Sequence, residues 1–110
     1  METKQNVREV LEALDAIKPN EIADSVKISW LSDINGKILC EICGFKVDEL
    51  PNISGEEDCL SVPVPYSRLY LLYLIYMIDF CGGDSSGYEK TKKEFDNAYN
   101  EYAKWYIRNK

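Results

Sequence analysis

The sequence predicts an all-α fold, a small four-helix domain with a long central loop that a short pair of strands could pin. Apolar residues recur at three- and four-residue steps in most of the chain, which is the spacing of helices with one buried face. Two capping boxes mark helix starts. The region 44–64 lacks the helical period. The chain of 110 residues has the size of one domain, 1–110, with a single core.

The first helix is predicted over residues 7–17. Asn6 and Glu9 form its capping box, and Pro19 ends it because proline cannot continue a helix. Its apolar stripe consists of Val7, Val10, Leu11, Leu14 and Ile17. One face of this helix should therefore lie against the core.

The second helix is predicted to follow a turn at 20–24 and to continue up to the loop at 44. Asn35-Gly36 conflicts with this prediction, because the dipeptide is also the strongest short signal for a hairpin turn. A continuous helix is preferred, since the period keeps its phase across Gly36 and glycine costs only about 1 kcal/mol there. The apolar stripe consists of Val26, Trp30, Leu31, Ile34, Ile38, Ile42 and Phe45.

The central loop is predicted over residues 44–64, where glycine and proline recur without helical spacing. Its apolar stretches 45–50 and 59–64 could form two short strands. A loop of this length is often functional in a compact domain. The acidic run 56–58 could be read as a cation site, but it lacks the alternating ligand spacing of a calcium loop, so a solvated loop is preferred.

The third helix should begin near Pro65 or Tyr66 and end at Gly82-Gly83, which can supply a left-handed cap. Apolar residues cover every side of it, so it should be surrounded by other elements. These residues are Leu69, Tyr70, Leu72, Tyr73, Ile75, Tyr76, Met77, Ile78 and Phe80.

The fourth helix should begin at a second capping box, Ser86 with Glu89. Its apolar stripe should pack lengthwise on another helix. The stripe consists of Tyr88, Thr91, Phe95, Ala98, Tyr102 and Trp105. The outer face, turned to solvent or to a partner, consists of Lys90, Lys93, Glu94, Asn97, Lys104 and Arg108.

The composition argues against an enzyme. The chain has no histidine, which excludes Ser-His-Asp and Cys-His nucleophile systems and removes the usual general base near neutral pH. Gly82-Gly83 follows a predicted helix and lacks the Lys-Ser/Thr of a phosphate-binding loop. We therefore expect no catalytic residue, no cofactor and no metal.

The cysteines are expected to stay reduced, because the chain shows no export signal. Cys40 and Cys43 form a C-x-x-C within a helical pattern, with no second pair at the spacing of a zinc site. Small buried apolar side chains are preferred over metal ligands or a redox pair.

Charge is distributed unevenly along the chain. Residues 1–64 carry 6 basic and 13 acidic residues, whereas residues 88–110 carry 6 basic and 4 acidic ones. The acidic part argues against binding of the phosphate backbone, so free duplex DNA is not expected as a ligand. The longest apolar run, 69–78, is too short and too rich in tyrosine for a membrane span. We expect a protein of the cytosol without membrane contact.

Two motifs near the C-terminus resemble a known family. V-P-x-P-Y-x-x-L-Y-x-x-Y-L-x-x-M-I-D covers residues 62–79, and F-x-x-A-Y-x-E-Y-A-K-W-Y covers residues 95–106. Together with the earlier segments they resemble, in order and spacing, the small head-tail connector (head-completion) proteins of tailed phages and prophages. The earlier segments are Lys18-Pro19-Asn20, Lys27-x-x-Trp30-Leu31, Asn35-Gly36-Lys37-Ile38, Glu41-Ile42 and Leu60.

The resemblance implies a structural virion protein that is assembled in the bacterial host cytoplasm. Such a protein forms a ring beneath the portal after DNA packaging and helps to join head and tail. Its partners would be further copies of itself, the portal, and tail or other head-completion proteins, with DNA only as cargo that passes through the channel. An acidic chain suits this role, since a negative channel lets DNA slide without sticking.

A partner surface is expected on the segment 48–64 and on the outer face of the last helix, because the two regions carry opposite charge and the chain has a surplus of aromatic area. Its candidate residues are Asp48, Glu56, Glu57, Asp58, Tyr66, Tyr70, Lys90, Lys93 and Lys104. The tyrosines could instead simply line the groove between the last two helices. The alternative function is a small helical adaptor or regulatory module of a mobile element that binds another protein through this groove.

Overall fold

The computed structural model describes residues 3–83 and 85–109, and it is mainly helical with four α-helices. In chain order the elements are β1 (Lys4–Asn6), α1 (Val7–Ile17), α2 (Asp24–Glu41), the 3-10 helix η1 (Val47–Glu49), β2 (Cys59–Pro63), α3 (Arg68–Gly82) and α4 (Ser85–Asn109). The four-helix prediction is confirmed. A small antiparallel sheet is added to it, so the fold is mainly α.

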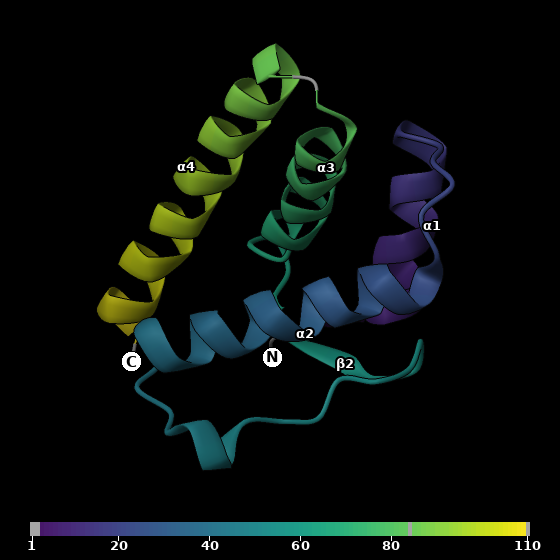
Figure 1. Ribbon diagram of the computed structural model, residues 1–110. Helices are drawn as coiled ribbons and strands as arrows, with labels where there is room; N and C mark the ends of the chain where they lie inside the picture. The colour runs from purple at the N-terminus through teal and green to yellow at the C-terminus, as the bar shows by residue number, and fades with distance from the viewer. Residues whose placement is uncertain (1–2, 84, 110) are drawn as a thin grey trace.

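Three helices, α1, α3 and α4, form a layer, and α2 crosses one end of it (Figure 1). α3 and α4 lie side by side as an antiparallel hairpin, and α1 packs on the other side of α3 (Figure 1). α2 crosses the lower end of this layer in the view of Figure 1, and β2 and the loop with η1 lie beyond it. Side chains from all four helices and from β2 meet in one core, which includes Leu14, Leu31, Leu60, Leu74 and Phe95.

The strand pair differs from the predicted one. The stretch 59–64 does contain a strand, but β2 pairs with β1, with Lys4 opposite Pro63 and Asn6 opposite Cys59. The stretch 45–50, predicted as the partner strand, forms an irregular turn and η1 instead. The strand that pairs with β2 is instead formed by residues 4–6, which lead directly into α1.

The start of α1 depends on both its own sequence and the central loop. The predicted capping box is present: Glu9 N–H donates to Asn6 Oδ1 at 2.9 Å, and Asn6 N–H donates to Glu9 Oε1 at 3.1 Å. Val7 and Arg8 N–H donate to the carbonyl oxygens of Asp58 and Glu56. The N–H groups of a first helical turn have no partner within the helix, so the loop satisfies two of them.

α2 is continuous through Asn35-Gly36, as predicted. A side-chain carbon at Gly36 would lie 3.2 Å from Leu50 Cδ1, closer than most such contacts, so the glycine lets the loop pack against the helix. The helix stops at Glu41, and Gly44 follows with a left-handed φ of 77°. The dipeptide therefore serves packing here and makes no turn.

The starts of the last two helices differ from the prediction, whereas the end of α3 agrees with it. α3 begins at Arg68, later than predicted, because residues 64–67 form a turn that contains a cis Val64–Pro65 peptide bond. Gly83 caps its end with φ 75°, as predicted. α4 begins at Ser85, which puts Ser86 inside the helix, so the predicted capping box at Ser86 is wrong. The residue before this helix, 84, lies outside the described residues.

α3 is not surrounded on every side, contrary to the prediction. Leu69, Tyr70, Leu72 and Leu74 are buried, but Phe80 is exposed. Six further apolar side chains of the helix are only half-buried, namely Leu71, Tyr73, Ile75, Tyr76, Met77 and Ile78. Three neighbouring helices cannot enclose a fourth completely, and one face of α3 remains open to solvent.

Candidate protein-binding site

A buried carboxylate joins three helices at one end of the layer. Asp79 of α3 is only 6% exposed, and Lys18 Nζ, just after α1, lies 2.5 Å from its Oδ1. The Thr91 hydroxyl of α4 donates to Asp79 Oδ2 at 3.2 Å. Burial of a carboxylate is costly without such partners. The group therefore holds α1, α3 and α4 in one arrangement.

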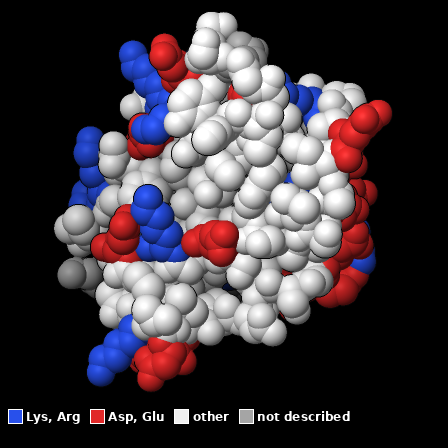
Figure 2. Space-filling model, viewed as in Figure 1, with Lys and Arg blue, Asp and Glu red and all other residues white. Residues whose placement is uncertain are grey.

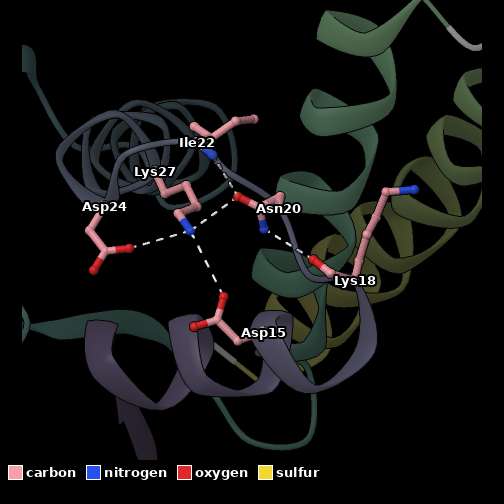
Figure 3. Close-up of polar contacts among 6 residues, drawn as sticks. All are labelled: Asp15, Lys18, Asn20, Ile22, Asp24 and Lys27. Atoms are coloured by element: carbon pink, nitrogen blue, oxygen red, sulfur yellow. Dashed lines mark hydrogen bonds and ion pairs between the residues drawn. The ribbon is translucent and has the colours of Figure 1, made fainter.

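A buried lysine joins the two N-terminal helices (Figure 3). Lys27 of α2 is only 2% exposed, and its Nζ lies 3.3 Å from Asn20 Oδ1, 3.3 Å from Asp24 Oδ1 and 4.0 Å from Asp15 Oδ1. Asn20 also shapes the turn, since its Nδ2 donates to the carbonyl oxygen of Lys18 and its Oδ1 accepts from the backbone N–H of Ile22. The sequence pattern did not predict that this lysine is buried.

A third polar group joins β2 to the helices. Asn35 Oδ1 accepts from the Tyr70 hydroxyl at 2.6 Å and from Ser61 N–H at 3.0 Å, and Asn35 Nδ2 donates to Ser61 Oγ at 3.2 Å. The Tyr70 hydroxyl in turn accepts from Val62 N–H at 3.0 Å. Tyr70 is 0% exposed. It belongs to the core, and the prediction that it contacts a partner is not compatible with this position.

A fourth pair lies near the other end of α4. The Tyr99 hydroxyl donates to Glu41 Oε1 at 2.5 Å and so links α4 to the last turn of α2.

The residues of these four polar groups include many of those that carry the family resemblance. Lys18, Asn20, Lys27, Asn35, Glu41, Tyr70, Asp79 and Tyr99 all belong to the motifs quoted above.

An aromatic groove opens where the ends of α2 and α4 meet the central loop. Its cavity has a volume of about 470 Å³. Its aromatic and apolar lining consists of Leu39, Phe45, Pro51, Tyr102, Trp105 and Tyr106. Tyr66 packs beside two of these rings in a tilted arrangement, with its ring centroid 5.4 Å from that of Trp105 and 5.9 Å from that of Tyr102. Of the predicted partner residues, only Tyr66 lies beside this groove. The sequence predicted the loop as a partner surface but not the end of α2, which contributes Leu39 and is followed by Cys43 and Phe45 in the lining.

The hydroxyl groups of Tyr102, which lines the groove, and of Tyr99, which contacts Glu41, are protonated near neutral pH. Burial, and then the nearby Cys43, raise the pKa of Tyr102 above its ordinary value. Burial and the hydrogen bond to Glu41 raise the pKa of Tyr99. Tyrosine and tryptophan suit a protein-binding surface, because they combine a large apolar area with a polar tip. The groove can bind an apolar segment and fix its backbone through hydroxyl groups.

These tyrosines should make the protein less stable in alkali. A phenol with a higher pKa in the folded than in the unfolded state stabilises the fold fully below the unfolded pKa of about 10, and that stabilisation is lost as the pH rises above it. Tyr99→Phe should therefore make the free energy of unfolding fall less steeply above about pH 10 than in the wild type. Urea unfolding followed by circular dichroism across this pH range measures it.

Glu41→Gln should also make the free energy of unfolding fall less steeply with rising pH, because it removes the charge that disfavours ionisation of Tyr99. Equal slopes for the wild type and both variants would contradict the role assigned to this pair.

The cysteines lie apart from any metal-binding arrangement. Cys40 and Cys43 are half-buried free thiols, and Cys59 and Cys81 are exposed. The prediction of small buried side chains is therefore wrong for Cys59 and Cys81. Among residues 3–83 and 85–109 there is no group of three or more metal-ligating side chains.

Replacement of both Cys40 and Cys43 by alanine should leave the protein folded. Half-buried thiols contribute only part of the burial energy of a core side chain, so a loss of about 1 to 2 kcal/mol is expected. Circular dichroism and zinc analysis of the purified protein measure the outcome. Stoichiometric zinc in the wild type, lost together with helicity in the variant, would contradict it.

The acidic run of the central loop is largely occupied within the chain. The Asp58 carboxylate accepts from the backbone N–H groups of Ser54 and Gly55 at 2.8 and 2.9 Å, and these bonds lower its pKa. Glu56 and Glu57 form ion pairs with Arg8 of α1. Asp58 thus closes its own turn, whereas the two glutamates remain partly exposed beside α1.

The basic residues predicted as partner contacts lie on the outer face of α4. Lys90, Lys93 and Lys104 are exposed there. Asp48 is exposed on η1. Basic side chains gather along the edge of the molecule over α4, mixed with acidic ones, and acidic side chains gather along the opposite edge over α1 (Figure 2). The centre of this face, over α3, is almost free of charge.

No family model, no curated protein and no solved structure matches this chain. In the described part of the chain, every helix is too short or too polar to cross a membrane.

Proposed function

We propose that the chain is a structural virion protein of a tailed phage or prophage, a head-tail connector subunit that forms a ring under the portal after DNA packaging. The observation that carries this proposal is the pairing of motif residues. Lys18 meets Asp79, Asn35 meets Tyr70, and Glu41 meets Tyr99. Motif residues that contact one another across the fold would be needed together in any chain that shares this fold, and this supports the proposal.

The surface chemistry is compatible with this role. The chain offers an aromatic groove that could hold an apolar segment of the portal or of another copy, and two edges of different charge. Its net charge of -6 would disfavour adhesion of DNA that passes through a channel. The surfaces thus serve protein contacts, and the DNA remains cargo.

The test combines the purified chain with the portal protein encoded by the same phage or prophage. Sedimentation velocity and electron microscopy should show a ring bound coaxially to the portal, at low salt and over a series of concentrations. The chain with Trp105→Ala serves as a check on the groove, because truncation of a buried aromatic side chain at a contact typically costs 2 kcal/mol or more, as a rough guide. Absence of any complex between the wild-type chain and the portal would overturn the proposed function.

The aromatic groove also favours the alternative of a small helical adaptor. An adaptor would remain monomeric at all concentrations and bind a protein other than the portal through Tyr102, Trp105 and Tyr106. Gene neighbours that encode portal and capsid proteins favour the connector, and their absence favours the adaptor.

A further inference from the structure

The outermost stripe of α4 is basic. At 100° per residue, Lys93, Asn97, Asn100 and Lys104 lie opposite the buried face of this helix, and all four are exposed. Two further cations, Lys90 and Arg108, are exposed beside them. Three exposed glutamates border the stripe: Glu89 lies one turn before Lys93, and Glu94 and Glu101 lie on the side of Lys90 and Arg108, so the stripe is basic along its centre. We call Lys90, Lys93, Asn97, Asn100, Lys104 and Arg108 the α4 stripe.

The outermost stripe of α1 is acidic. Glu9, Glu12 and Ala16 lie opposite its buried residues and are exposed. Glu56 and Glu57 of the central loop extend the acidic surface beside Arg8, which pairs with both. We call Glu9, Glu12, Ala16, Glu56 and Glu57 the α1 surface.

The two surfaces lie on opposite edges of the molecule, with α3 between them (Figures 1 and 2). Their lengths agree: the 11 residues of α1 extend over about 16 Å, and Lys93 and Lys104 are separated by about the same distance along α4. A second copy placed beside the first in the same orientation would therefore bring the α4 stripe of one copy alongside the α1 surface of the next.

We propose that copies of this chain associate head to tail, with the α4 stripe of one copy against the α1 surface of its neighbour. The inference rests on the proposed function, because it specifies the contact that would build the ring. Two different surfaces on opposite edges form a heterologous contact, which closes into a ring when the rotation between neighbours permits. α1 thereby replaces most of the segment 48–64 that the sequence predicted as the partner of α4.

The charges decide the register and the rate of this contact. Opposite potentials steer the encounter and suppress wrong arrangements, such as α4 against α4, where like charges would meet. Exposed charges are screened at high ionic strength, so the association should weaken as salt is added. Apolar side chains near the ends of these helices, Ile17 and Ile107, are 63% and 65% exposed and could add buried area.

The test uses two variants whose altered residues are exposed. Lys93→Glu/Lys104→Glu places two negative charges at the centre of the α4 stripe, and Glu12→Lys/Ala16→Lys places two positive charges at the centre of the α1 surface. Each variant alone would place like charges against each other, so half-assembly should need about a hundredfold higher concentration than in the wild type. An equimolar mixture of the two should assemble again when the variants alternate, because the altered α4 stripe of one then meets the altered α1 surface of the other, and the two unaltered surfaces meet each other, with opposite charge at both contacts. Sedimentation velocity at low salt measures all three samples.

The control for the α4 variant is Lys37→Glu/Lys46→Glu, which makes the same change in net charge as Lys93→Glu/Lys104→Glu at exposed positions of α2 and the following loop. It should assemble like the wild type. Unchanged assembly of either reversed variant, failure of the mixture to assemble, or equal loss in the control would overturn the proposed contact. A wild-type chain that binds the portal but never self-associates would overturn this contact and leave the proposed function intact. A chain that does neither overturns both.

Discussion

Leu72→Asp is expected to prevent folding. Leu72 lies in α3 and is only 8% exposed, within the core cluster that all four helices share. An unpaired charge placed there costs several kcal/mol, against a total stability of about 5 to 15 kcal/mol for a domain. The variant should lose its cooperative urea transition and most of its helical circular dichroism, and it should accumulate as aggregate.

Ile75→Asp is the matched control on the same helix. Ile75 is only half-buried, because the face of α3 that carries it is open to solvent. A carboxylate at this position can reach water, so the variant should stay folded with a smaller loss of stability. Soluble, cooperative unfolding of Leu72→Asp, with a midpoint close to that of Ile75→Asp, would contradict the burial of Leu72.

Lys18→Met is expected to lower the free energy of unfolding by about 2 to 4 kcal/mol. Methionine is unbranched and nearly as long as lysine, but it removes the charge that faces Asp79. The Asp79 carboxylate then stays buried, with a hydrogen bond from the Thr91 hydroxyl but without the facing positive charge. Removal of one partner of a buried pair costs more than the pair contributes, because the other charge is left without compensation. The lower part of the usual range applies since Lys18 itself is partly exposed.

Asp79→Asn in the Lys18→Met background tests the cause. Asparagine has nearly the shape of aspartate and still offers an oxygen to Thr91, but it carries no charge. The double variant should therefore be more stable than Lys18→Met alone when both are unfolded in urea at neutral pH. If Lys18→Met unfolds within about 0.5 kcal/mol of the wild type, the Lys18–Asp79 pair does not hold the helices together.

The approximate positions of the four helices could be predicted from the sequence, because the signals that mark a helix are local. The stripe of α1 and its Asn6–Glu9 capping box lie within one segment of the chain, and both ends of this helix agree with the prediction. The continuity of α2 and the left-handed cap of α3 at Gly83 were also predictable from period and residue type. Helical hydrogen bonds join residues close in sequence, so a short stretch carries enough information to place a helix.

The burial of polar residues and the pairing of strands depend on tertiary contacts and could not be predicted from the sequence. Lys27, Asn35 and Asp79 are buried because residues far away in the sequence supply their partners. β2 pairs with the N-terminus, since the first turn of α1 needs acceptors that the loop provides. The aromatic groove and the opposition of the α1 surface to the α4 stripe likewise depend on how the helices are placed in space. Such contacts join segments that no local pattern relates, so they follow from the packing of the whole chain.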